Sequence, residues 1–147
     1  VWAYDQENDE HHPNHMVVSR DGGHTWSSPI DTGVMGQASN LIWLGGDLLA
    51  TIHSHREGEI GIVVRIVDFK DDRWRVLAEQ TIYGQGGGAQ TRAGQTSSEM
   101  FASLRFGQPS LLRLSDTHLS DIELLAAHWA VEDGQGLIRL HRLRLEL

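Results

Sequence analysis

The stretch Ser19-Arg20-Asp21-Gly22-Gly23-His24-Thr25-Trp26 decides the fold that this sequence predicts. It follows the apolar run Met16-Val17-Val18 and precedes a second strand-like segment, residues 27–32. An aspartate and two glycines between strands favour a turn, because glycine adopts positive φ angles and aspartate hydrogen-bonds nearby amides. Trp26 is large enough to anchor such a turn to a sheet. The stretch therefore predicts a β-hairpin.

The composition limits the class of protein. The chain has 147 residues, 39% of them hydrophobic, which is enough for one globular core. A net charge of −8 disfavours a nucleic-acid partner, because phosphate binding requires a basic face. No apolar run has membrane-spanning length, so we expect no membrane partner. The chain has no cysteine, which removes disulfides and thiolate sites but leaves both an extracellular and a cytoplasmic location open. No cofactor is expected.

The pattern of apolar residues predicts an all-β fold. Expected strands cover residues 1–4, 15–20, 27–32, 39–44, 48–53, 61–68, 74–83, 108–114, 124–131 and 137–147. Residues 84–98 are too poor in apolar groups to bury themselves and predict a long loop. In the last strand the alternation shifts phase between Leu140 and Leu143, which predicts a β-bulge.

An internal repeat relates the expected strands. Residues 2–26 align with residues 50–74 at a constant offset, so that Trp26 meets Trp74 and Val18 meets Ile66. The second turn, Phe69-Lys70-Asp71, is a degenerate copy of the first. A repeat of roughly 40–50 residues built from four strands is typical of β-propellers.

The pattern Ser19-x-Asp21-x-Gly23-x-Thr25-Trp26 resembles the Asp-box, or BNR repeat, of sialidase-like β-propellers, and residues 106–136 are similar to the last blade of such proteins. The resemblance implies a C-terminal portion of the six-bladed type, with about two and a half four-stranded antiparallel blades. Residues 1–147 would form a single partial propeller with units 1–35, 36–84 and 105–147, and a long loop 85–104. The missing blades would come from another chain, a second copy or sequence beyond these residues.

The resemblance also implies where a ligand would lie. In that family the Asp-box, here Ser19, Asp21, Gly23, Thr25 and Trp26, is a structural turn on the side away from the ligand. The ligand would meet the loops at the opposite end, here residues 5–15, 33–39, 54–60, 84–107 and 131–136. These loops are rich in carboxylates, histidine, glutamine and arginine, which suit a carbohydrate with its many hydroxyl groups.

Candidate site residues follow from these loops. Glycoside hydrolysis needs paired carboxyls, or a carboxyl acid with a tyrosine nucleophile in sialidases, so the catalytic candidates are Asp5, Glu7 and Glu132. The substrate-binding candidates are His53, His55, Arg56, Arg105 and Gln108. His53 and His55 alternate along a strand and should share a face. The alternative for each is structural: a polar cluster at the end of a strand, or a hairpin turn at Glu132. No metal site is expected, because His11, His12 and His15 fit a solvated loop.

The chain departs from the sialidases at residues that matter for their activity. Their tyrosine nucleophile lies near the first strand of the final blade, where this chain has Gln108-Pro109-Ser110, and their arginine triad has no clear match. Tyr83 and Arg105 are the nearest substitutes. We therefore expect a glycan-directed propeller, as a glycoside hydrolase (exo-sialidase-like) fragment with an incomplete active site. The alternatives are a non-catalytic carbohydrate-binding or adhesion propeller, and a fragment that assembles with a second copy.

Overall fold

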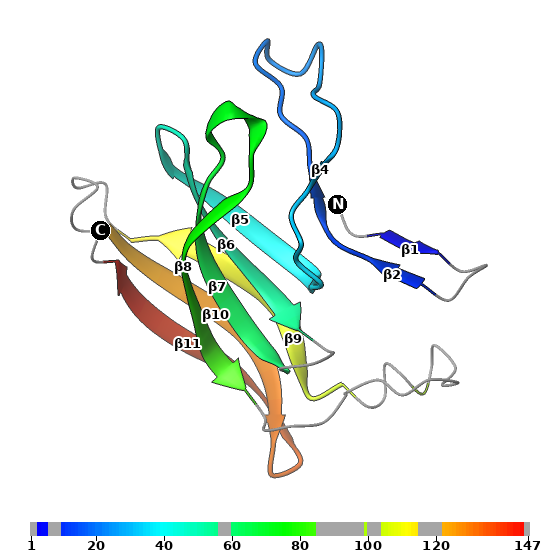
Figure 1. Ribbon diagram of the computed structural model, residues 1–147. Coiled ribbons are helices and arrows are strands. Elements are labelled where there is room, and N and C mark those ends of the chain that lie inside the picture. The colour runs from blue at the N-terminus through cyan, green and yellow to red at the C-terminus, as the bar shows by residue number, and fades with distance from the viewer. Residues whose placement is uncertain are drawn as a thin grey trace.

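The described part of the chain is mainly antiparallel β-structure (Figure 1). The computed structural model describes residues 3–5, 10–55, 60–84, 99, 104–114 and 122–145. Its strands are β1 (Ala3–Asp5), β2 (Glu10–His12), β3 (His15–Met16), β4 (Ile30–Asp31), β5 (Gln37–Gly45), β6 (Leu48–His55), β7 (Gly61–Asp68), β8 (Arg75–Gly84), β9 (Phe106–Arg113), β10 (Ile122–Glu132) and β11 (Gln135–Leu145). A short 3-10 helix covers Lys70–Asp72. The prediction of an all-β fold is confirmed, and no helix in the described ranges is long and apolar enough to cross a membrane.

Two sheets form the body of the molecule. The strands β5–β6–β7–β8 follow one another in a four-stranded meander, and β9–β10–β11 form a three-stranded one. These are the four strands expected in residues 36–84 and the three expected in residues 105–147. The pairs β1–β2 and β3–β4 form two short ladders, and only Pro13 and Asn14 separate β2 from β3.

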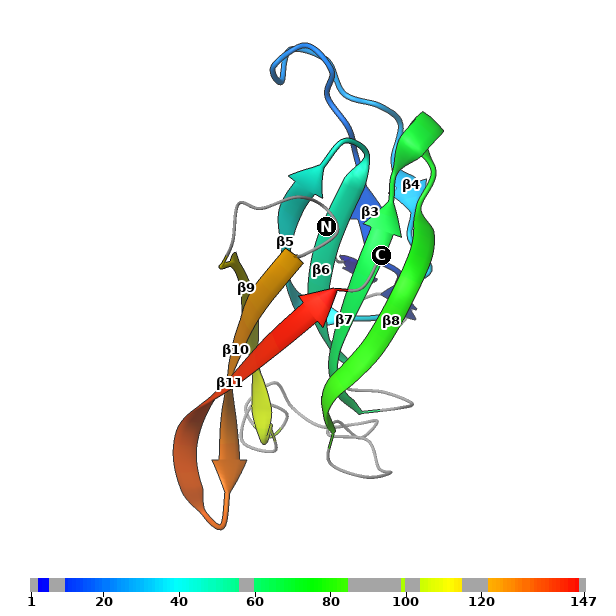
Figure 2. The same ribbon diagram turned by 90° about the vertical axis from the view of Figure 1, so that its left-hand side faces the viewer.

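The core lies between the two sheets, which pack face to face (Figure 2). Alternate residues of each strand point into it, as the pleat of a strand requires. The β5–β8 sheet contributes mainly branched aliphatic side chains, and the β9–β11 sheet contributes Phe106, Leu111 and alternate residues of β10. The fully buried members include Ile52, Ile62, Phe106, Ile122 and Leu124.

The N-terminal unit, which we define as residues 10–36, differs from its predicted form in three ways. β3 and β4 are two residues long, so the strands expected over residues 15–20 and 27–32 are too long. The expected loop 5–15 contains β2, which pairs with β1. The expected anchor Trp26 is 61% exposed. The turn is instead held to the rest of the chain by an ion pair of 2.6 Å between Arg20 and Asp72.

The prediction of a β-bulge in the last strand is wrong. The register between β10 and β11 is continuous from Ile122 opposite Leu145 to Glu132 opposite Gln135. The phase shift instead divides the apolar side chains between two faces, so that Leu143 packs on the core while Leu140 is exposed. A register irregularity does occur, but between β10 and β9, where Gln108 has a φ angle of 49°.

Candidate functional site

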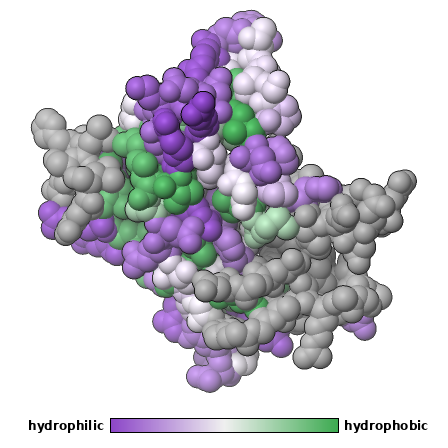
Figure 3. All heavy atoms as spheres, in the orientation of Figure 1, coloured by the Kyte–Doolittle hydropathy of each residue, from purple (hydrophilic) through white to green (hydrophobic). Residues whose placement is uncertain are grey.

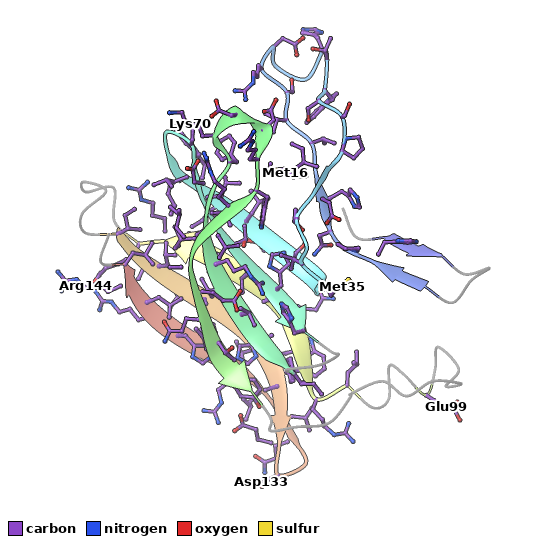
Figure 4. All side chains as sticks on the ribbon, viewed as in Figure 1. Met16, Met35, Lys70, Glu99, Asp133 and Arg144 are labelled. Carbon is purple, nitrogen blue, oxygen red and sulfur yellow. The ribbon has the colours of Figure 1, made fainter. Side chains whose placement is uncertain are left out.

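The two sheets present their turns at opposite ends, which we call the Asp-box end and the loop end. At the Asp-box end, Arg20 reaches the 3-10 helix that connects β7 to β8. At the loop end, Gly61 pairs with both His55 and Gly84. Figure 4 shows the separation, with Lys70 at the top and Asp133, in the β10–β11 turn, at the bottom. The strand ends at His55 and Gly61, and the β10–β11 turn at Asp133, therefore lie away from the Asp-box turn.

The Asp-box turn is held by its own side chains. The Asp21 carboxylate accepts hydrogen bonds from the Thr25 amide (2.9 Å), the Thr25 hydroxyl (2.6 Å) and the Ser19 hydroxyl (2.9 Å). The Gly23 amide donates to Ser19 Oγ over 2.7 Å. These bonds, that of the Thr25 hydroxyl first, lower the pKa of Asp21 to about 2. The glycines supply the positive φ angles, 73° at Gly22 and 92° at Gly23.

A polar cluster occupies the loop end between the two sheets. The Tyr83 hydroxyl, from the end of β8, donates to Glu132 Oε1 over 3.0 Å. The Arg139 guanidinium donates to both oxygens of the same carboxylate. Its Nε lies 3.0 Å from Oε1, and its Nη2 makes a closer contact with Oε2. The hydrogen bond from Arg139 is the main cause of the lowered pKa of Glu132. Glu132 is thus held ionised, next to a phenol whose proton points at it.

Two histidines complete this loop-end cluster. The ring of His128 lies 4.5 Å from that of Tyr83 and stacks on His141, with 5.2 Å between centroids. His128 Nδ1 donates to the Trp129 carbonyl, so its Nε2 accepts, over 3.0 Å, from His141 Nε2. Burial lowers the pKa of both histidines. The loop-end cluster, Tyr83, His128, Glu132, Arg139 and His141, therefore holds neutral imidazoles beside one carboxylate and one guanidinium.

A second polar group lies on the other face of the β5–β8 sheet. Arg65 is 7% exposed, pairs with Glu79 over 2.6 Å and contacts His55 Nε2 with both terminal nitrogens at 3.2 Å. His53 is 4% exposed, and burial and then the charge of Arg65 lower its pKa to about 3. The expectation that His53 and His55 share a face is confirmed. Gly36 closes over His53, because a Cβ at that glycine would lie 2.8 Å from His53 Cβ.

The remaining predicted residues are placed as follows. Glu7 and Arg56 lie outside the described residues, and Asp5 is described as part of β1. Arg105 is exposed, and its carbonyl accepts from the Val131 amide at the base of the β10–β11 hairpin, 2.7 Å away. Gln108 is exposed at the irregularity of β9. Of the candidates, the structure thus brings Glu132 and Arg105 to the same end, and His53 and His55 to another face.

Sequence reasoning missed several residues of these groups. Arg65 is the one charge within the apolar run of β7, and that interruption was a usable signal. Arg139 follows Glu132 by seven positions, but its partner in the β10–β11 ladder is His128, while Glu132 lies opposite Gln135. Cross-strand pairing around the Asp133-Gly134 turn therefore does not predict the contact between Arg139 and Glu132. The contact of Tyr83 with Glu132 spans 49 residues and carries no local signal.

No group of three or more His, Cys, Asp or Glu is placed to hold a metal ion within the described part of the chain. Compared with known proteins, the chain matches no protein-family model, no curated sequence and no solved structure.

Proposed function

We propose that this chain is part of a sialidase-like β-propeller that acts on a glycan at the loop end of its sheets. The meander order of the strands and the packing of consecutive sheets face to face support this architecture. The Asp-box hydrogen-bond network, at the end away from the loop-end cluster, supports it as well. The chain would supply some of the blades, and a second copy, another chain or further sequence would supply the rest.

The hydrogen bond of Tyr83 to Glu132 carries the functional proposal. An ionised carboxylate that accepts a phenolic proton makes the phenol oxygen a better nucleophile. Arg139 fixes the carboxylate in its orientation through a fork of two contacts. Tyr83 would attack the anomeric carbon of the sugar, and Glu132 would take its proton. A second carboxyl, for which Asp5 and Glu7 are the candidates, would protonate the leaving oxygen.

A panel of fluorogenic glycosides tests this proposal on the full chain. We expect turnover of at least one sugar, and a loss of about a hundredfold or more in kcat for Tyr83→Phe and Glu132→Gln. The thermal midpoint of each variant, measured in parallel, separates loss of chemistry from loss of folding. Turnover that survives Tyr83→Phe in a folded protein contradicts the nucleophile assignment.

Non-catalytic glycan binding is the second candidate. The ion pair between Arg139 and Glu132 favours this candidate. Arg139 already occupies both oxygens of the carboxylate, which makes Glu132 less available to accept a proton. A glycan array with the same chain distinguishes the two functions: saturable binding without turnover supports a binding propeller. If the chain shows no turnover and no binding, a glycan-directed function is contradicted altogether.

A further inference from the structure

The strand β11 has an open edge beside a groove between the two large sheets. The β9–β11 sheet has three strands and the β5–β8 sheet has four, so β8 extends beyond the edge that β11 forms (Figure 2). Among the described residues, those that pair with β11 belong to β10 alone. Alternate residues of β11 therefore direct their N–H and C=O groups away from the sheet, and this edge can accept a further strand.

The inner face of β8 is uncovered as well. Residues 75–81 of β8 are all exposed, whereas residues 61–67 of the neighbouring β7 are all buried. Ala78 lies opposite Ile66 and Gln80 lies opposite Val64, so both point to the same side as these core residues. On that side, within the part of the chain that the structure describes, the second sheet ends before it reaches β8.

A groove of about 410 Å³ lies on this uncovered side of β8. Its floor is formed by Val64 and Ile66 of β7 with Ala78 of β8, and its wall is formed by Leu143 and Leu145 of β11. Leu143 and Leu145 pack on the core but are only partly buried. Figure 3 shows apolar surface in the region where β8 and the end of β11 lie in Figure 1. We call this hollow the β8–β11 groove.

A strand added to β11 would run through this groove. It would lie about 4.8 Å from β11, which is the usual spacing of paired strands. Every second side chain would point to the floor, because successive side chains of a strand alternate between its two faces. These positions require apolar residues, since the floor and the wall are aliphatic. The remaining side chains would lie next to the outward side chains of β11.

The charge of β11 selects the residues at those remaining positions. β11 carries three arginines and no carboxylate, and two of them, Arg142 and Arg144, line the groove. Arg142 binds Glu123 through Nη2 alone, over 2.6 Å, so the other N–H donors of its guanidinium can bind further acceptors. Glu79 also lines the groove, but its carboxylate pairs with Arg65 over 2.6 Å. Carboxylates on the added strand would therefore pair favourably with this edge.

We propose that the β8–β11 groove binds an extended peptide in which apolar and acidic residues alternate, and that this peptide adds to β11 as a fourth strand. Its apolar side chains cover Val64, Ile66 and Ala78, and its carboxylates face Arg142 and Arg144. A second copy of the chain is a poorer occupant, because its own β11 would bring three further arginines and no carboxylate to the same edge. The groove shares no residue with the loop-end cluster and does not depend on the glycan function proposed for it.

NMR titration of the isotope-labelled full chain with synthetic peptides tests the proposal. The probe is Glu-Val-Glu-Val-Glu-Val-Glu, blocked at both ends, and the matched control is Lys-Val-Lys-Val-Lys-Val-Lys. We expect saturable binding of the glutamate peptide below about 1 mM, and at least tenfold weaker binding of the lysine peptide. Glu-Ser-Glu-Ser-Glu-Ser-Glu keeps the charge without the apolar side chains, and should also bind at least tenfold more weakly.

Variants of the chain locate the binding. Ala78→Gln places an amide on the apolar floor and should weaken binding of the glutamate peptide about tenfold. The control is Val76→Gln, at an exposed residue that lies opposite Val67 and so points to the other side of β8; it should bind normally. Amide hydrogen exchange gives a second readout, because an added strand should slow the exchange of those β11 amides that point away from β10.

Several outcomes would overturn the proposal. Equal affinity for the glutamate and lysine peptides does so, as does the absence of saturable binding to the parent chain. A folded Ala78→Gln protein that binds as tightly as Val76→Gln overturns it too. Binding that leaves the exchange of every β11 amide unchanged overturns it by assigning the peptide to another surface. A dimer of the free chain that Ala78→Gln dissociates, with no peptide bound, overturns it in favour of a second copy.

Discussion

At the scale of single residues, Asp21 closes the Asp-box turn, because its carboxylate binds both donors of Thr25. Asp21→Asn replaces one acceptor oxygen by a donor that faces the Thr25 hydroxyl. We expect the thermal midpoint at pH 7 to fall by about 2–4 °C, a range typical of a lost capping interaction in a chain of this size. Asp47→Asn, an exposed aspartate in the β5–β6 turn, is the control and should leave the midpoint unchanged.

The pKa of Asp21 adds a dependence on pH. In the folded chain this pKa is about 2, below the ordinary aspartate value of 3.8, so the contribution to stability is present above about pH 4. It is lost as the pH falls from about 4 to about 2. The difference in thermal midpoint between the parent chain and Asp21→Asn should therefore shrink at pH 2.5. A difference that is the same at pH 7 and pH 2.5 contradicts this account.

His53 adds a second dependence on pH, in the same sense as Asp21 but beginning at a higher pH. Its pKa of about 3 in the folded chain lies below the ordinary histidine value of 6.5, because burial disfavours the imidazolium. The unfolded chain therefore binds a proton that the folded chain does not, and stability falls as the pH drops from about 6.5 towards 3. Between pH 5 and 4 this group alone should lower the free energy of unfolding by about 1.4 kcal/mol per pH unit.

Urea unfolding at several pH values checks the prediction for His53. His53→Gln should reduce the slope of stability against pH between pH 5 and 4, while His24→Gln, at an exposed position, should not. Equal slopes in His53→Gln and the parent chain would mean that His53 is protonated in the folded state.

At the scale of elements, the close pairing of β7 with β8 requires a glycine at position 61. A Cβ at Gly61 would lie 2.6 Å from the Tyr83 carbonyl oxygen and 3.0 Å from Thr81 Cγ2. Gly61→Ala must therefore push β8 away, and should lower the free energy of unfolding by about 1–3 kcal/mol. In Gly136→Ala, by contrast, the Cβ meets nothing within 4 Å, so this change in β11 should be neutral or slightly stabilising. Urea unfolding of both variants makes the comparison, and equal stabilities would contradict it.

Local patterns sufficed to predict the strands of the two larger sheets, because each strand alternates or is uniformly apolar and ends at a turn signal. The shortness of β3 and β4 was not predictable. The Asp-box turn is satisfied by its own side chains, so its flanks need no long ladder. The phase shift in β11 predicts a bulge, but the strand is unbroken and carries apolar residues on both faces. Periodicity alone does not distinguish these two cases.

At the scale of the whole molecule, the candidate sites depend on contacts that no local pattern contains. Glu132 and His53 were predictable as residues at strand ends. Their partners were not, because Tyr83 and Glu132 lie on different sheets, and the surroundings of His53 require the N-terminal unit to pack on β6. The expectation that the ligand loops and the Asp-box turn lie at opposite ends rested on family resemblance rather than on spacing.

The outer face of the β9–β11 sheet is apolar and exposed. Leu112, Ile138 and Leu140 are 57%, 67% and 63% exposed, and Ile138 lies opposite Trp129 across the β10–β11 ladder. Within the described residues, β11 pairs with β10 alone and leaves its other edge open. Contiguous apolar surface of this kind marks an interaction site, and an open edge invites further pairing.

We therefore expect the isolated chain to self-associate through this face at concentrations of about 10–100 μM, since burying it removes apolar area from water. The double variant Ile138→Lys, Leu140→Lys should be monomeric, because burying two ammonium groups without partners is costly. Leu77→Lys, on an exposed position of β8, is the control and should associate as the parent chain does. Sedimentation velocity measures all three. A parent chain that stays a folded monomer throughout this range would exclude assembly from two copies, and would leave another chain or further sequence to cover the β9–β11 face.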